Sequence, residues 1–453
     1  MSRSRRLLLA AVLPLGLAAP ATAAGAPFAP PQTLDLPVTG PLAAAVGPRG
    51  DAVVAGVVSG APVQARIEVA TRSTAAAPWR LAGFGTAAGQ IRDVQVVIGR
   101  SGTVIAWAEN RRHSRSVVVA TADAAAHLTI RARFAVGDAF AAYPRLAVLR
   151  SGAVVAAWRD GRFGARSRVR VATIDGGRPT APRTAGANAS QIVLAARARG
   201  ATVGWTSQFR AVPRTGARSV PRALPRTLTV RSLDAHGLPT GAAVRVGSDV
   251  GATARLAGAP DGRVVASWMR PQKIRSYAGE DRGDAPPPSA YIAPRAFTRQ
   301  LLPRLAPARP LGGPSEIAAG VPSVGFDGPG HAVAALRASA PAVGPAYDAR
   351  LSGSAGGGPW SGSRLVAHLG FSRLDPVVTV PSPGDAVVVY TALIPAPGTP
   401  VWSVGAADAT GTQALGVTNA GDGRGIAVAR AADRVLVAWP SAGGVQVAER
   451  SGA

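Results

Sequence analysis

The chain has 453 residues, no cysteine and a single lysine, Lys273, and its formal net charge at pH 7 is +26. The absence of cysteine excludes a disulfide framework and a thiolate metal site. After the N-terminal region no segment approaches 18 apolar residues, so no membrane-spanning helix is predicted. A positive excess of this size, carried by arginine, predicts long-range attraction to anionic partners.

The first residues have the pattern of an export signal. Arg3, Arg5 and Arg6 make a basic start, Leu7 to Ala19 an apolar stretch, and Ala21-Thr22-Ala23 a cleavage site of small residues. Ser4-Arg5-Arg6-Leu7-Leu8-Leu9 also resembles a twin-arginine signal, so the export route stays open between this and ordinary secretion. We therefore predict a signal peptide over residues 1–24 and a single domain over residues 25–453, located outside the cytoplasm or in the cell envelope.

From residue 52 onward one short pattern recurs eight times: a turn is followed by an apolar run that usually ends in a large side chain. The runs end at Val57, Trp107, Trp158, Trp205, Trp268, Leu336, Tyr390 and Trp439, which are 47 to 68 residues apart. Short strands in a repeat of this length are typical of a β-propeller blade. The sequence thus predicts an all-β fold, a β-propeller of eight four-stranded antiparallel blades, with seven as the alternative.

Residues 143–180 show one repeat in full. We predict strands at Tyr143–Leu149, Ala153–Trp158 and Ser167–Thr173, a loop over 159–166, and a weak fourth strand after the turn Asp175-Gly176-Gly177. The last repeat stops after its third strand, Gly444–Glu449, whereas an extra strand, Gln32–Pro37, precedes the first repeat. Pairing these two strands would complete the last blade and remove its exposed edge.

Tryptophan occupies the same place on the second strand of five repeats. A row of aromatic side chains can be a ligand platform, but its constant position favours packing between neighbouring blades. We therefore assign these residues to the core: Trp107, Trp158, Trp205, Trp268 and Trp439.

Arginine is concentrated in the loops between the second and third strands of repeats two to five. These loops should lie on one face of the ring, so they predict a binding surface for an anionic polymer. In repeat four the arginines are spaced by four along a proline-interrupted segment, where an extended chain would set them about 12 Å apart. The predicted ligand-binding residues are Arg111, Arg112, Arg159, Arg162, Arg210, Arg214, Arg218, Arg222, Arg226, Arg270 and Arg275.

The turn Thr173-Ile174-Asp175-Gly176-Gly177-Arg178-Pro179-Thr180 resembles a degenerate Asp-box of sialidase-like propellers, with weaker echoes at Asp123, Asp234 and Asp408. Tyr143-Pro144-Arg145-Leu146 and Trp107-Ala108-Glu109-Asn110-Arg111 resemble parts of the first sialidase blade. The resemblance covers repeats two to four. It implies a propeller fold, in which the Asp-box is structural, and a possible glycosidase activity.

The chain also departs from that family. Its order is Pro144-Arg145 rather than Arg-Ile-Pro, and no tyrosine has a glutamate partner at motif spacing. Retaining glycosidases need two carboxyl-type groups converging on the scissile bond. Glu109 and Asp160 are the only candidates on the expected face, and we expect both to be solvated loop residues.

The favoured hypothesis is thus an exported, non-catalytic, monomeric propeller that binds an anionic polysaccharide or another polyanion through its arginine loops. Nucleic acid is a weaker partner, because these loops hold few aromatic residues for base stacking. The scattered histidines predict no metal site and no cofactor. The alternatives are a divergent sialidase-like glycoside hydrolase using the same face, and a protein-interaction module whose charge is incidental.

Overall fold

In the ranges that the computed structural model describes, the named elements of secondary structure are all strands. No helix in those ranges is long and apolar enough to cross a membrane. The predicted export signal lies outside these ranges. They are residues 26–59, 65–85, 89–137, 142–161, 167–207, 211–212, 222–223, 226–251, 253–271, 273–274, 291–312, 316–328, 331–339, 346–355, 358–370, 372, 374–394, 401–418 and 425–451.

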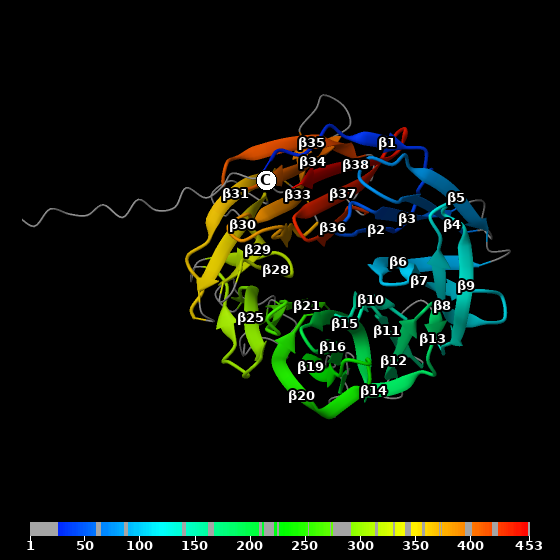
Figure 1. The fold of residues 1–453 in the computed structure, drawn as a ribbon. Coiled ribbons are helices and arrows are strands. Elements are labelled where there is room, and N and C mark those ends of the chain that lie inside the picture. Colours follow the sequence, from blue (N-terminus) through cyan, green and yellow to red (C-terminus); the bar gives the residue numbers. More distant parts are fainter. Residues whose placement is uncertain are drawn as a thin grey trace, which may run out of the picture.

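Eight antiparallel sheets stand around a central axis as the blades of a propeller (Figure 1). Blade 1 contains β2 (Leu42–Val46), β3 (Ala52–Ser59), β4 (Ala65–Arg72) and β5 (Arg80–Gly85), and blade 2 contains β6 (Gln90–Gly99), β7 (Gly102–Asn110), β8 (Arg115–Ala122) and β9 (Leu128–Ala135). Blade 3 contains β10 (Arg145–Val148), β11 (Val154–Asp160), β12 (Arg168–Asp175), β13 (Arg178–Pro179) and β14 (Arg183–Ala187). Blade 4 contains β15 (Ala189–Arg197), β16 (Gly200–Ser207), β19 (Arg226–Leu233) and β20 (Pro239–Val250).

Blades 5 to 8 repeat the arrangement, and β21, β28 and β36 are the strands nearest the axis in blades 5, 6 and 8 (Figure 1). Blade 5 contains β21 (Ala254–Gly258), β22 (Val264–Arg270), β25 (Arg295–Leu302) and β26 (Arg309–Pro310). Blade 6 contains β27 (Ile317–Ala318), β28 (Ser323–Phe326), β29 (His331–Ser339), β30 (Tyr347–Ala355) and β31 (Arg364–Gly370). Blade 7 contains β32 (Val377–Thr379), β33 (Val387–Ile394), β34 (Val401–Ala407) and β35 (Thr412–Thr418), and blade 8 contains β36 (Ala427–Ala431), β37 (Arg434–Ser441), β38 (Gly444–Ser451) and β1 (Gln32–Leu34).

The ring closes through the N-terminal strand, as predicted. β1 pairs antiparallel with β38, with Thr33 opposite Gln446, so the two ends of the chain share blade 8. Arg72 of blade 1 forms an ion pair with Glu449 of β38, which also contacts Arg434 at 3.2 Å. The pairing of β1 with β38 covers the strand edge that β38 would otherwise expose.

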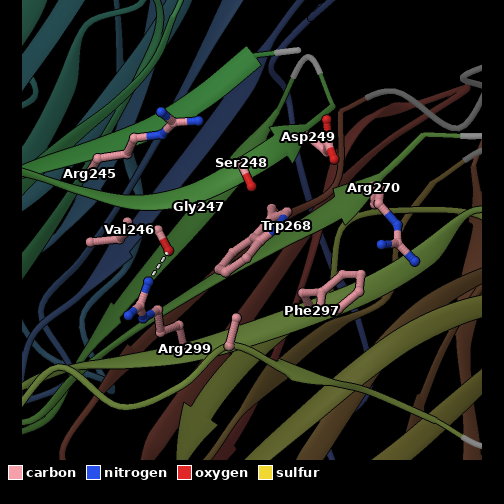
Figure 2. A pocket seen from close by; sticks show the side chains of 10 residues that line it. Arg245, Val246, Gly247, Ser248, Asp249, Trp268, Arg270, Phe297 and Arg299 are labelled. Atoms are coloured by element: carbon pink, nitrogen blue, oxygen red, sulfur yellow. Dashed lines mark hydrogen bonds between the residues drawn. The ribbon is translucent and has the colours of Figure 1, made fainter.

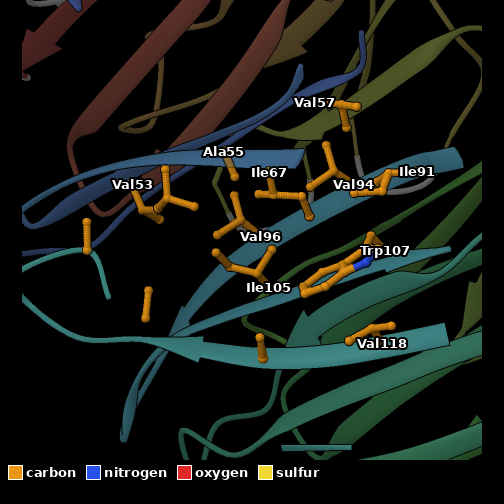
Figure 3. Packing of buried hydrophobic residues seen from close by; sticks show 14 of the residues in the cluster. Val53, Ala55, Val57, Ile67, Ile91, Val94, Val96, Ile105, Trp107 and Val118 are labelled. Atoms are coloured by element: carbon orange, nitrogen blue, oxygen red, sulfur yellow. The ribbon is translucent and has the colours of Figure 1, made fainter. Parts of the chain in front are cut away.

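The apolar core lies between adjacent blades, and the second-strand tryptophans fill it. Figure 3 shows Trp107 and Ile105 of blade 2 among Val53, Ala55 and Ile67 of blade 1. At the next seam Trp158 stacks on Phe134 with ring centroids 4.7 Å apart. The five tryptophans are at most 4% exposed, which confirms the packing role predicted for them.

Three of the four predicted structural aspartates hold turns after third strands through backbone hydrogen bonds. Asp123 and Asp234 each accept two backbone N–H bonds from residues two and four positions further on, at 2.8–2.9 Å. Asp408 accepts the N–H of Thr410 at 2.7 Å. Such bonds replace the backbone partners that a tight turn cannot supply, so these aspartates stabilise the turns of the fold.

Two local expectations were wrong. Glu109 lies within β7 and Arg159 and Asp160 within β11, because the strand ladders run further than the apolar runs that predicted them. The arginine-rich segment of blade 4 is not one extended run either. It contains a short antiparallel pair, β17 (Ala211–Val212) with β18 (Arg222–Ala223), which makes the chain reverse direction.

The corresponding loop of blade 5 has a similar pair. β23 (Lys273–Ile274) runs antiparallel to β24 (Tyr291–Ile292), so Lys273 lies opposite Ile292. Both long loops thus leave their blades as hairpins.

Candidate functional site

The predicted binding loops and the beginnings of the innermost strands lie at the same end of the ring. In blades 2, 3 and 5 the early residues of the innermost strand pair with the last residues of the second strand: Arg92 with Ala108, Arg145 with Ala157 and Arg255 with Ser267. The loop to the third strand follows directly. We call this end of the propeller the loop face.

The first predicted carboxylate, Glu109, is fully buried and held by two arginines. Its Oε1 lies 2.9 Å from Nε of Arg111, and its Oε2 accepts a hydrogen bond from Arg133 on the outermost strand of the blade. The expectation of a solvated loop residue was therefore wrong. Both carboxylate oxygens are engaged, so Glu109 serves the fold of blade 2.

The second predicted carboxylate, Asp160, ends β11 and is partly exposed. Its Oδ2 lies 3.9 Å from Nε of Arg170 on the third strand of the same blade. This partner, like those of Glu109, lies away from the axis, so neither residue brings its carboxylate beside arginines of the innermost strands.

The predicted arginines have different surroundings. Arg111 and Arg112 are exposed in their loop, and Arg226 and Arg270 are partly exposed. Arg159 is fully buried, so its guanidinium is not accessible to a polymer in this conformation. Arg222 lies in β18, but its side chain is outside what the structure describes, as are the whole residues Arg162, Arg210, Arg214, Arg218 and Arg275.

One charge cluster that the sequence did not predict spans three blades. Asp375, just before β32 of blade 7, lies 3.5 Å from Nη2 of Arg255 in blade 5 and 3.4 Å from Nε of Arg337 in blade 6. It also accepts the N–H of Val321 at 3.1 Å. Blades 5 and 7 are not neighbours, so an ion pair between their innermost strands can form only close to the axis.

Space for this cluster comes from a glycine. A Cβ on Gly320 would overlap the Asp375 carboxylate, so the missing side chain lets Asp375 cross the inner edge of blade 6. Arg337 is fixed there by hydrogen bonds to the carbonyls of Ser372 at 2.7 Å and Ala319 at 2.6 Å. Among the described residues Arg255 has no such carbonyl partners, and its side chain remains 36% exposed, so it is accessible from solvent.

A second cluster lies on the innermost strands of blades 2 and 3. Asp93 follows Arg92 at a bulge in β6, and its φ of 54° is in the left-handed region. Tyr143, before β10, has a φ of 46°, and Arg145 follows it. Two strained backbone positions on adjacent strands, one of them in a bulge, are the kind of local distortion that aims side chains at functional sites.

Burial shifts the pKa values of three charged groups of these clusters, Asp93, Arg145 and Arg255. Desolvation raises the pKa of Asp93, opposed by Arg145 and Arg92. Desolvation lowers the pKa of Arg145, opposed by Asp93 and Tyr143, and lowers that of Arg255, opposed by Asp375. The positive charges are therefore incompletely compensated by the protein, and an anionic group placed beside them would stabilise their ionised form.

Together the two clusters, which we call the axial charge clusters, hold four guanidiniums and two carboxylates. The guanidiniums are those of Arg92, Arg145, Arg255 and Arg337, and the carboxylates those of Asp93 and Asp375. Only the Tyr143-Pro144-Arg145 motif carried a signal for this site in the sequence. Arg255, Arg337 and Asp375 meet only through the ring geometry.

No protein-family model matches the chain, and none of the curated proteins matches it. Similar solved structures include a protein of unknown function from Dyadobacter fermentans, at 14% identity over 69% of this chain and 94% of that one, with a TM-score of 0.40. Solved sialidases are among them. The Trypanosoma rangeli enzyme is 12% identical over 75% of this chain and 58% of its own, with a TM-score of 0.39.

A polysaccharide lyase, an ulvan lyase, matches with 11% identity over 92% of this chain and 95% of that one, with a TM-score of 0.44. At these identities and scores the function has to be argued from the residues of this chain.

Proposed function

We propose that this chain is an exported, non-catalytic propeller that binds an anionic polysaccharide across its loop face. The observation that carries the proposal is the position of Arg145 and Arg255 on the innermost strands of blades 3 and 5, where both are partly exposed at the loop face. They lie at the same end of the ring as Arg111, Arg112 and Arg270. A negatively charged chain lying across this face would neutralise both groups, and the net charge of +26 would attract it from a distance.

Binding is favoured over hydrolysis by the surroundings of the predicted carboxylates. Glycosidases of both stereochemical classes use a pair of carboxyl groups on either side of the scissile bond. Here Glu109 is held by two arginines and Asp160 lies near a third. Neither is available as an acid or a nucleophile without breaking an ion pair.

One observation favours the alternative, a divergent glycoside hydrolase. Asp93 has a raised pKa, as a general acid requires, and Tyr143 lies on the neighbouring strand start. A hydrolase would have to use these residues rather than Glu109 and Asp160.

The test is retention of the purified protein on heparin and on cell-wall polysaccharide, followed by elution with salt. We expect binding that weakens with ionic strength, since salt screens charges over about 8 Å at physiological concentration. The double variant Arg145→Gln, Arg255→Gln should bind at least about tenfold more weakly, because each lost charge-assisted hydrogen bond is worth about 1.5–3 kcal/mol.

The matched control removes the same charge from the opposite face. Arg178 is exposed at the start of β13 and Arg304 is exposed in the turn after β25, and the variant Arg178→Gln, Arg304→Gln should bind as the wild type does. Equal weakening by both double variants would reduce the effect to net charge and contradict the proposal. The triple variant Arg214→Ser, Arg218→Ser, Arg222→Ser tests the contribution of the blade 4 loop in the same assay.

The same preparation is incubated with sialosides and with the retained polysaccharide. Release of reducing ends by the wild type, lost in Asp93→Asn, would establish the hydrolase and overturn the non-catalytic assignment.

A further inference from the structure

A pocket away from the axis lies between blades 4 and 5 (Figure 2). It has a volume of about 320 Å³ and is bounded by the outermost strand of blade 4, β20, and by β22 and β25 of blade 5. Small-molecule sites in proteins begin at about 300 Å³, so this pocket suits a compact ligand of one or two rings. The axial charge clusters contribute no residue to it.

Strand pairing sets the chemistry of the pocket wall. Trp268 of β22 pairs with Phe297 of β25, and their rings stack at 6.0 Å with an angle of 16°. Arg270 and Arg299 lie two residues beyond these aromatics on their strands, and alternation along a strand places them on the same side of the sheet. The wall is therefore an aromatic pair with a guanidinium at each end, as Figure 2 shows.

The three arginines of the pocket are held to different degrees. Arg299 donates to the carbonyls of Val246 at 2.8 Å and Ala306 at 2.5 Å, which fixes its position. Arg270 lies over the Phe297 ring at 4.9 Å, and its buried Nε has no hydrogen-bond partner among the described residues. Arg245 is exposed at the opposite wall. An unsatisfied buried donor is costly, so an acceptor in the pocket would be stabilising.

Asp249 is the sole carboxylate among the residues that line the pocket, against three guanidiniums. We propose that the pocket is a second binding site, which takes one sugar residue bearing a carboxylate or a sulfate. The anionic group lies between Arg245 and Arg270, whose planar forks match its oxygens. The sugar ring rests beside Phe297, and the hydroxyl of Ser248 bonds to a ring substituent.

The aromatic surroundings select a sugar over a nucleobase. Trp268 is only 3% exposed, and Arg270 covers a face of Phe297, so no open aromatic face is offered for stacking a flat base. A narrow space with several guanidiniums suits a compact anion on a saturated ring.

The ligand class rests on the proposed function, but the site is separate from the axis. One polymer that occupied both sites would bind more tightly than either site alone, because the second contact is intramolecular. Arg270, one of the predicted polymer-binding arginines, itself lines the pocket, so the pocket adjoins the predicted binding surface.

The experiment is isothermal titration calorimetry of the whole chain with a heparin disaccharide, which carries a uronate and sulfates. We expect two disaccharides per chain. Arg245→Gln combined with Arg270→Gln should leave one, as should Arg145→Gln combined with Arg255→Gln, and all four changes should abolish binding. Arg304→Gln, the same change at the other end of blade 5, is the control. Titration with a desulfated uronate disaccharide decides which anionic group is bound.

The outcomes separate the two proposals. If the Arg245 and Arg270 variant keeps the wild-type stoichiometry, or if no disaccharide binds at millimolar concentration, the pocket is not a sugar site. If the Arg145 and Arg255 variant keeps the wild-type stoichiometry whereas the Arg245 and Arg270 variant loses one disaccharide, the pocket is a sugar site and the axial proposal is contradicted. A single-stranded oligonucleotide is then added as a competitor. If it binds more tightly than the disaccharide and displaces it, and if this displacement requires Arg270, the pocket is assigned to nucleic acid and the sugar assignment is overturned.

Discussion

At the scale of single residues, carboxylates of similar sequence context have opposite roles. Glu109 is buried, and both of its oxygens are matched by arginine. Asp93 is also largely withdrawn from solvent, but burial outweighs the attraction of Arg145 and Arg92 and raises its pKa above 3.8. Burial therefore disfavours the charged form of Asp93 in the fold.

This difference predicts how stability depends on pH. Because the pKa of Asp93 is raised in the folded state, its protonated form stabilises the fold. This contribution is fully present at pH values below the unfolded-state pKa and is lost as pH rises through the folded-state pKa. Asp93→Asn should therefore gain stability relative to the wild type as pH increases from about 3 to 7. Urea unfolding of both proteins across this range measures the change.

The pH dependence of the difference is what decides this prediction. Asparagine tolerates the positive φ of residue 93 well, so the substitution can raise stability equally at every pH. A difference in unfolding free energy that does not vary with pH would show that Asp93 is ionised at no cost in the fold.

At the scale of strands, the seams between blades depend on small residues as much as on tryptophan. Gly186 of β14 leaves room for the Trp205 ring, where a Cβ would overlap the indole. Gly258 of β21 meets the carbonyl oxygen of Ala196 on β15, the neighbouring innermost strand. At this point the two innermost strands approach so closely that residue 258 has no room for a side chain.

Gly258→Ala should destabilise the protein by about 1–3 kcal/mol, the usual cost of overpacking a well-filled interior. The added methyl group meets backbone, which cannot rotate away as a flexible side chain could. Chemical denaturation measures the loss. Gly362→Ala, where a Cβ meets nothing within 4 Å, is the control, and similar stability of the two variants would contradict this account of the seam.

At the scale of the whole molecule, closure of the ring joins segments from the two ends of the chain. β1 covers β38, and buried Leu34 and Leu36 pack against residues of blades 1 and 8. Next to this seam Arg450 is buried between Asp385 and Asp408 at 2.6 and 2.7 Å, which ties blade 8 to blade 7. The last blade is therefore stabilised from both sides.

Removing residues 1–34 should lower the melting temperature and cause association that increases with protein concentration. The deletion exposes the edge of β38 and removes Leu34, whose burial is worth about 1.5–3 kcal/mol. Thermal melting and light scattering test this against a chain that begins at Ala26 and keeps β1. Identical melting of the two proteins would show that closure through β1 is dispensable.

Much of the fold could be predicted because its signals are local. The apolar runs before Trp107, Trp158 and Trp439 mark second strands, their spacing gives the blades, and the missing fourth strand of the last repeat indicates closure by residues near Gln32. Strand ends were less well predicted. At Glu109 and Asp160 the ladder continues through charged residues, because pairing with β8 and β12 outweighs their polarity.

The candidate site depended on distances that no local pattern contains. By itself the sequence determined a closed ring of blades and predicted an arginine-rich face, since periodicity and composition act over a few residues at a time. Only the tertiary structure decided that Arg255 and Arg337 meet Asp375 from three different blades, and that Arg270 and Arg299 flank an aromatic pair beside β20. The physical reason is that ring closure and strand pairing place residues that are far apart in the chain within a few ångströms of one another.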